Sequence, residues 1–187
     1  MTLHQPKSRP AIVLALSIAF LSPLAMQTPF VQTAGAAELK IASLSGNWRG
    51  KGKVKTSIKS KKENIRCRLT NRPVKNKSKM SILGTCSVGN FLLPVNGWIQ
   101  KKGKKNSYTA SLFNSLTRLS SNYFSGRISG KKLKLNYNGV DNITKQPIKA
   151  SITIIGSGSD NFHLEIKRAD PKTNKQFKVG TIKFKKH

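Results

Sequence analysis

The chain has few of the residues that enzymes use to move protons or bind metals. Its 187 residues include 6 Asp and Glu, 3 His and 2 Cys. His163 and Glu165 share one face of an expected strand, but no nucleophile accompanies them. Glu63 and Asp141 stand alone in the sequence, where an acid among many lysines usually serves as an ion-pair partner. The sequence therefore predicts no enzyme, no catalytic residue, no metal site and no cofactor.

The two cysteines, Cys67 and Cys86, are too far apart for a CxxC redox pair, and no histidine lies nearby to complete a zinc site. An even number of cysteines in an exported chain favours a disulfide. Both cysteines fall on the apolar side of successive expected strands. We expect them to face each other across one hairpin and to fix its register.

Long apolar runs are absent except near the N-terminus. A basic start over residues 1–10 precedes an apolar run over 11–26, and Ala34-Gly35-Ala36 supplies a cleavage site. This is the pattern of a secretory signal peptide. The run is shorter than the about 20 residues that a membrane-spanning helix needs. We expect a signal peptide over 1–36, Sec export to the periplasm or beyond, and one mature domain over 37–187 with no transmembrane segment.

No stretch shows a helical stripe of apolar residues, whereas alternation with a period of two is frequent. Ile65, Cys67 and Leu69 alternate with basic and polar residues, as expected for a half-buried strand. The same pattern recurs at 80–86, 132–137, 148–154, 162–166 and 177–179, separated by turn signals at 101–105, 129–132, 156–160 and 170–171. The sequence predicts an all-β fold, either a single antiparallel barrel or a closely related β-sandwich, with one disulfide.

Acidic residues are so scarce that 35 Lys and Arg give a formal net charge of +29. Such a charge attracts the protein to anionic surfaces. In a simple meander, the basic turns at 75–79, 101–105 and 131–132 would lie on one rim; the alternative is that lysines collect in turns because turns are solvated. The candidate anion-binding residues are Arg66, Arg68, Lys75, Lys77, Lys79, Lys101, Lys102, Lys104, Lys105, Lys131 and Lys132.

Several short motifs carry a family resemblance. The segments Leu44–Gly52, Glu63–Arg68 and Cys86-Ser87, extended by Tyr123–Ile128, resemble a group of small exported proteins of alphaproteobacteria, rhizobial relatives included. Members of that group are mostly of unknown function. The chain departs from them by its lysine content and by the Thr144–Pro147 segment.

The tripeptide Gly46-Asn47-Trp48 is similar to the G-x-W that opens lipocalin and avidin barrels, where the tryptophan plugs one end. That resemblance makes Trp48 a candidate ligand-cavity residue. The favoured alternative is a plain core role, because tryptophan is highly buried on average. Small bacterial protease inhibitors of the same barrel class also pair an early G-x-W with a disulfide.

Three functions fit these patterns. The first is a secreted, cationic, non-enzymatic binding protein, including an effector that acts on a host, with a host or bacterial protein or an anionic surface (lipid, lipopolysaccharide or acidic glycan) as partner. The second is a periplasmic small-ligand carrier with an apolar interior. The third is a protease or hydrolase inhibitor that uses the expected 71–79 loop or the mature N-terminus. Nucleic acid is disfavoured because the aromatic residues are spaced as core and no binding motif is present.

Overall fold

The computed structural model describes residues 38–55, 57–74, 78–103, 105–112, 123–141, 144–170 and 172–187. The expected signal peptide (1–36) lies outside these residues, as do the anion-binding candidates Lys75, Lys77 and Lys104.

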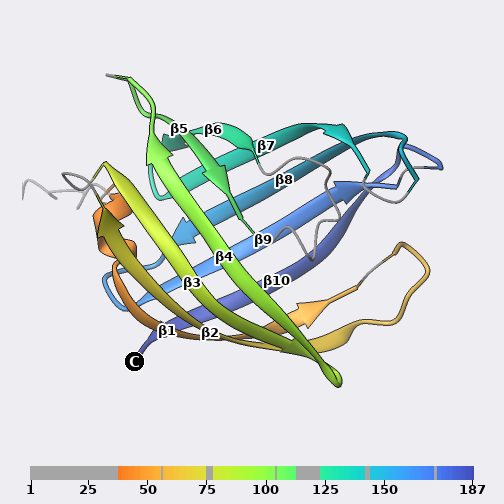
Figure 1. Ribbon diagram of the computed structural model, residues 1–187, viewed down its shortest axis with the longest axis horizontal. Coiled ribbons are helices and arrows are strands. Elements are labelled where there is room, and N and C mark those ends of the chain that lie inside the picture. Colours follow the sequence, from red (N-terminus) through yellow and green to blue (C-terminus); the bar gives the residue numbers. More distant parts are fainter. Residues whose placement is uncertain are drawn as a thin grey trace, which may run out of the picture. The chain divides into compact units, whose positions relative to one another are not determined.

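In the described residues, ten antiparallel strands close into a barrel in the order β1-β10-β9-β8-β7-β6-β5-β4-β3-β2 (Figure 1). A short 3₁₀ helix, η1 (Ile41–Leu44), precedes β1. The strands are β1 Gly46–Val54, β2 Glu63–Val74, β3 Lys79–Val88, β4 Phe91–Lys101, β5 Ser107–Ser111, β6 Phe124–Ser129, β7 Lys132–Val140, β8 Pro147–Gly156, β9 Asn161–Ala169 and β10 Gln176–Lys186. The prediction of an antiparallel all-β barrel is confirmed, and the sandwich alternative is not what forms.

The period of two in the sequence becomes the inside and outside of the barrel wall, because successive side chains of a strand point to opposite faces. In β7, Leu133, Leu135 and Tyr137 are buried while their neighbours Lys132 and Lys134 are exposed. The inward residues of all the strands belong to one continuous apolar core. The lysines therefore occupy the alternate positions that the barrel turns toward solvent.

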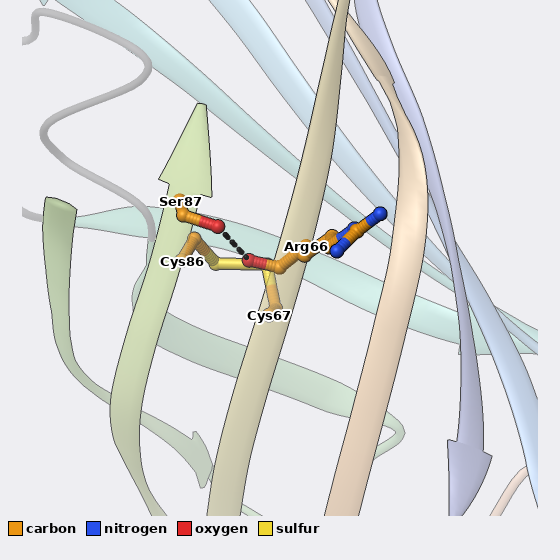
Figure 2. Close-up of a disulfide and its surroundings, with 4 residues drawn as sticks. All are labelled: Arg66, Cys67, Cys86 and Ser87. Carbon is orange, nitrogen blue, oxygen red and sulfur yellow. Dashed lines mark hydrogen bonds between the residues drawn. A yellow bond between two sulfur atoms is a disulfide. The ribbon is translucent and has the colours of Figure 1, made fainter. Parts of the chain in front are cut away.

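Cys67 and Cys86 are direct partners in the β2–β3 ladder and form the expected disulfide, with their Cα atoms 4.0 Å apart. Both are buried on the inner side of the wall. Figure 2 shows the bridge between the two strands and the Arg66 side chain pointing away from it, with the Ser87 hydroxyl donating to the Arg66 carbonyl oxygen at 3.5 Å. The bridge thus fixes the register that the alternating pattern requires.

The prediction of a loop over 71–79 is wrong in its extent, because the loop in the structure is shorter. β2 continues to Val74 and β3 begins at Lys79, so only residues 75–78 lie between the two strands. Pro73 lies within β2, opposite Met80. Proline is tolerated there because the β1–β2 ladder begins at Asn71, so Pro73 lies beyond β1 and has a strand neighbour on one side only.

The barrel has two rims, named here by what they carry. The η1 rim holds η1 and the turns that follow β2, β4, β6 and β8; the Phe91 rim holds the β1–β2, β3–β4, β7–β8 and β9–β10 connections. The three basic turns therefore share the η1 rim, as predicted. Backbone hydrogen bonds join neighbouring turns, from Lys101 N to the Ser78 oxygen (2.9 Å) and from Ile128 N to the Asn106 oxygen (3.0 Å). Positive charge is not confined to that rim, however, because the β1–β2 connection on the Phe91 rim carries Lys55, Lys59, Lys61 and Lys62.

Candidate anion-binding face

Six cations form two rows across the outer surface of β10, β1 and β2. In the first row, Lys51 pairs with Lys183 on one side and with Arg66 on the other; in the second, Arg49 pairs with Lys185 and with Arg68. All six side chains are exposed. We call this set the basic face; its members are Arg49, Lys51, Arg66, Arg68, Lys183 and Lys185.

The sequence of β1 explains how one half of this face arises. Trp48, Gly50 and Gly52 point inward, so Arg49 and Lys51 point outward. A β-carbon on Gly50 would lie 2.5 Å from the Phe184 ring, so glycine at this position makes room for that ring beside β1. The outer surface of β1 therefore carries Arg49, Lys51 and Lys53 next to Asn47, while its inner surface is tightly packed.

Neither row contains an acidic residue among the described residues. The first row continues to His163 on β9 and to Ser87 and Leu92 on the other side. The second continues to Asn161, and to Thr85 and Pro94. The nearby carboxylate of Glu165 lies in a different row, and it is paired with Lys178 at 3.3 Å. The basic face therefore keeps its positive charge.

Two shallow hollows flank Lys51 on the outer surface. One of about 820 Å³ is lined by four members of the basic face together with the hydroxyl residues Thr85 and Ser87 and by Leu92. The other, of about 690 Å³, is lined by Lys53, Lys55, Lys62, Lys178 and Lys183 among others. Ammonium, guanidinium and hydroxyl donors around an open hollow suit a ligand that carries several anionic oxygens.

The structure divides the predicted anion-binding residues between two places. Arg66 and Arg68 belong to the basic face. The other described candidates lie at the η1 rim, at strand ends or in turns: Lys79, Lys101, Lys102, Lys105, Lys131 and Lys132. Lys79 is half-buried there, with its ammonium 5.1 Å from the centre of the Trp98 ring.

Sequence reasoning missed Arg49, Lys51, Lys183 and Lys185. Their alternation with inward residues was visible within β1 and β10. What the sequence did not reveal is the register in which the first and last strands pair, which places Lys183 beside Lys51 and Lys185 beside Arg49.

Trp48 is buried near the η1 rim. Its indole N–H donates to the Leu44 carbonyl oxygen at 2.9 Å, and the Asn71 amide donates to the same oxygen at 2.8 Å. Its ring packs edge-on against Phe162, with a centroid distance of 4.7 Å. Above it lies the Lys186 ammonium, 5.7 Å from the ring centre. These contacts describe a core residue; a ligand-binding role for Trp48 stays a prediction.

An interior hollow of about 10 Å³ lies next to Leu44 and Phe162, two residues that contact Trp48. Asn71 and several apolar side chains complete its lining. The Asn71 side-chain oxygen is buried without a hydrogen-bond donor among the described residues. A hollow of this size holds about one water molecule. Within the described residues, this part of the interior is therefore filled by side chains.

The Phe91 rim holds a buried ion pair that the sequence did not reveal. Asp141 serves as an ion-pair partner, as expected, but of Arg168 (3.9 Å) rather than of a lysine, and both side chains are almost fully buried. The other carboxylate oxygen of Asp141 accepts from Thr144 N (2.8 Å) and Thr144 Oγ1 (3.1 Å). Arg168 also stacks near the Phe177 ring, at 5.4 Å.

The β9–β10 turn has hydrogen bonds like those around Asp141. Asp170 Oδ1 accepts from Thr173 N and Lys172 N at 3.0 Å each. The backbone N–H of Thr173 is the main cause of a lowered pKa for the Asp170 carboxyl. In both turns the residue four positions after the aspartate donates to the aspartate carbonyl and has a positive φ: Lys145 at 59° and Asn174 at 54°.

The described residues contain no group of three or more His, Cys, Asp or Glu side chains placed to hold a metal ion. Nor does this part of the chain contain a helix long and apolar enough to cross a membrane.

Comparison with known proteins identifies the fold but no family. No protein-family model and no curated protein matches the chain. Among solved structures, the chain is similar to an S-type phycobiliprotein lyase from Guillardia theta, with a TM-score of 0.55 and 9% identity over 78% of this chain and 89% of that one. It is also similar to a protein of unknown function of the DUF3598 family from Nostoc punctiforme, with a TM-score of 0.51 and 10% identity over 81% of this chain and 50% of that one.

At such low identity these likenesses show the fold alone, and they agree with the prediction of a lipocalin-like antiparallel barrel. The resemblance to exported alphaproteobacterial proteins stays a prediction.

Proposed function

We propose that this chain is an exported, non-enzymatic binding protein that binds anionic groups on the basic face. The observation that carries the proposal is the pair of rows Lys183–Lys51–Arg66 and Lys185–Arg49–Arg68. Like charges directly opposite each other in a sheet destabilise it, by up to about 1 kcal/mol for each pair. The two rows hold four such contacts, and a polyanion bound across them would replace repulsion by attraction.

Two features support export. The N-terminal 36 residues have the composition of a signal peptide, and the barrel contains a disulfide, which persists in oxidising compartments. Outside the cytoplasm, the available polyanions are anionic lipids, lipopolysaccharide and acidic glycans. If the source organism lives within a host, the exported protein would act as an effector by binding anionic groups on host surfaces.

The carrier alternative places the ligand inside the barrel. The hollow beside Asn71 and Phe162 is about 10 Å³, far below the roughly 300 Å³ of a typical small-molecule pocket. The inhibitor alternative needs an exposed loop or the mature N-terminus to enter a cleft, and most of the 71–79 segment, its candidate loop, is strand instead. Both features favour a ligand on the outer surface.

The test is binding of the processed protein to heparin, an acidic glycan, at low and at raised salt. The variant Lys51→Gln/Arg66→Gln/Arg68→Gln removes three charges from the basic face. Its control, Lys134→Gln/Lys149→Gln/Lys167→Gln, removes three exposed charges from β7, β8 and β9. At about 0.2–1 kcal/mol for each exposed ion pair, the first variant should bind about 3- to 150-fold more weakly than the wild type.

The control should lose much less affinity, because its lysines lie on other strands. Equal losses in the two variants would mean that net charge alone determines binding, and would refute a localised site. Raised salt should weaken wild-type binding, since the contacts are exposed and screened.

A further inference from the structure

The β3–β4 hairpin presents two large apolar side chains to solvent. Phe91 and Leu92 are each 73% exposed, more than the other large apolar residues of the described chain. They directly follow the two-residue turn Gly89-Asn90, in which Gly89 has a φ of +53°, a conformation that favours glycine. Exposed apolar side chains that contribute nothing to the core commonly mark an interaction site.

We call Phe91 and Leu92 the apolar tip; it is continuous with the basic face. Leu92 pairs with Ser87, Ser87 with Arg66, and Arg66 with Lys51, so the first cationic row ends at the tip. Leu92 also lines the outer hollow with Arg49, Arg66 and Arg68. One continuous surface therefore runs from exposed cations to exposed hydrocarbon.

The neighbouring β1–β2 connection presents the same combination at the Phe91 rim. Ile58 is 38% exposed, and its carbonyl oxygen accepts from the Lys55 ammonium at 3.2 Å. Lys59, Lys61 and Lys62 lie close by in the sequence and are exposed or nearly so. Figure 1 shows this connection and the β3–β4 hairpin at the same side of the barrel.

The geometry points to an anionic lipid bilayer as the partner of this surface: Phe91 and Leu92 enter the headgroup–acyl boundary while the basic face and the β1–β2 lysines contact lipid phosphates. This rests on the proposed function, because it names the anion that the basic face binds. Apolar side chains flanked by Lys and Arg bind bilayer interfaces through both burial and charge. A dissolved polyanion uses the cations and their hollow, and it gains nothing from the exposed Phe91 ring.

One acid lies near the tip. A β-carbon placed on Gly89 would lie 3.4 Å from Glu63 Oε2, so this carboxylate is beside the hairpin turn. It opposes contact with an anionic bilayer, and Lys61 and Lys62 precede it directly in the sequence. The net charge of that segment therefore still favours anionic lipid.

The experiment is co-sedimentation of the processed protein with vesicles of phosphatidylcholine alone or mixed with phosphatidylglycerol. Wild-type protein should bind only the anionic vesicles. The variant Phe91→Ser/Leu92→Ser should bind them more than about tenfold more weakly, because burial of either side chain contributes at least that factor. Heparin binding should be unchanged in the single variant Phe91→Ser, because Phe91, unlike Leu92, does not line the outer hollow. The matched control Val74→Ser/Leu83→Ser changes two exposed apolar residues away from the tip and should bind both partners as the wild type does.

A second measurement reports insertion directly. The variant Phe91→Trp should show a blue-shifted emission with anionic vesicles and no shift with heparin. The native Trp48 is buried and Trp98 is half-buried, so the difference from wild-type protein isolates the new indole.

The outcomes separate the two proposals. Binding to heparin without binding to anionic vesicles overturns the lipid inference and leaves the proposed function standing. Vesicle binding that the Phe91→Ser/Leu92→Ser variant retains, with no shift for Phe91→Trp, overturns insertion of the tip. Failure to bind either partner removes the proposed function itself.

Discussion

Replacing Asp141 by asparagine should destabilise the barrel strongly. Asn keeps an acceptor oxygen for the Thr144 N–H and hydroxyl, so the turn between β7 and β8 retains its cap. What disappears is the negative charge 3.9 Å from the Arg168 guanidinium, in a place where the Arg168 side chain is 4% exposed. Leaving a buried charge without its counter-charge costs about 3–5 kcal/mol. For a domain of this size, that corresponds to a fall in Tm of roughly 6–20 °C.

Asp170→Asn is the control, because the β9–β10 turn has similar hydrogen bonds around a more exposed carboxylate, whose pKa depends more on those bonds than on Arg168. It should lower the free energy of unfolding much less than Asp141→Asn does, because Asp170 is more exposed. Urea denaturation of the two variants, followed by circular dichroism, measures the difference. Similar losses in both would refute the argument, since the turn rather than the buried pair would then carry the energy. The double variant Asp141→Asn/Arg168→Met should recover part of the loss by removing the buried guanidinium charge as well.

Three further outcomes follow from the structure. Cys67→Ala/Cys86→Ala should lower the free energy of unfolding by roughly 3 kcal/mol, given a sequence separation of 19, as measured by urea denaturation against oxidised wild type. The Thr173 N–H lowers the pKa of Asp170, so the ionised carboxylate stabilises the fold above the unfolded-state pKa. This contribution is lost as the pH falls through the lower folded-state pKa. A carboxyl-carbon NMR titration that shows an unshifted or raised pKa for Asp170 would contradict this. Glu63→Gln should raise affinity for anionic vesicles by about fivefold, measured by the same co-sedimentation, whereas unchanged affinity would place Glu63 away from the bilayer.

Local pattern made much of the fold predictable. Alternation around Cys67 and Cys86 indicated both the strands and the apolar side on which the sulfur atoms meet, because side-chain direction in a strand has a period of two. The same reasoning placed the basic turns after β2, β4 and β6 on one rim. It did not extend β2 to Val74, because Arg72-Pro73 reads as a turn signal and the absence of a β1 neighbour there is a tertiary feature.

The candidate site was only half predictable, since it depends on which distant strands become neighbours. Arg66 and Arg68 follow from the pattern of one strand. Lys183 and Lys185 join them only because β10 closes the barrel against β1. Asp141 and Arg168 meet for a similar reason: Asp141 directly follows β7 and Arg168 lies in β9, and no local sequence motif predicts their contact.

The position of the cations argues against composition as the whole explanation of the basic face. A lysine-rich composition alone would scatter cations over the outward positions, as on the far side of the barrel. There, the row of Arg127 and Lys134 continues to Thr153 and Glu165, and Lys167 lies between Ser151 and Lys178. Two of the outward rows that cross β10, β1 and β2 hold three consecutive cations, whereas the row Thr181–Lys53–Asn64 holds one. The two cationic rows lead toward the hairpin that bears exposed phenylalanine and leucine. The Lys and Arg side chains of the basic face repel one another beside the exposed apolar tip. An anionic partner bound at that place would offset this repulsion.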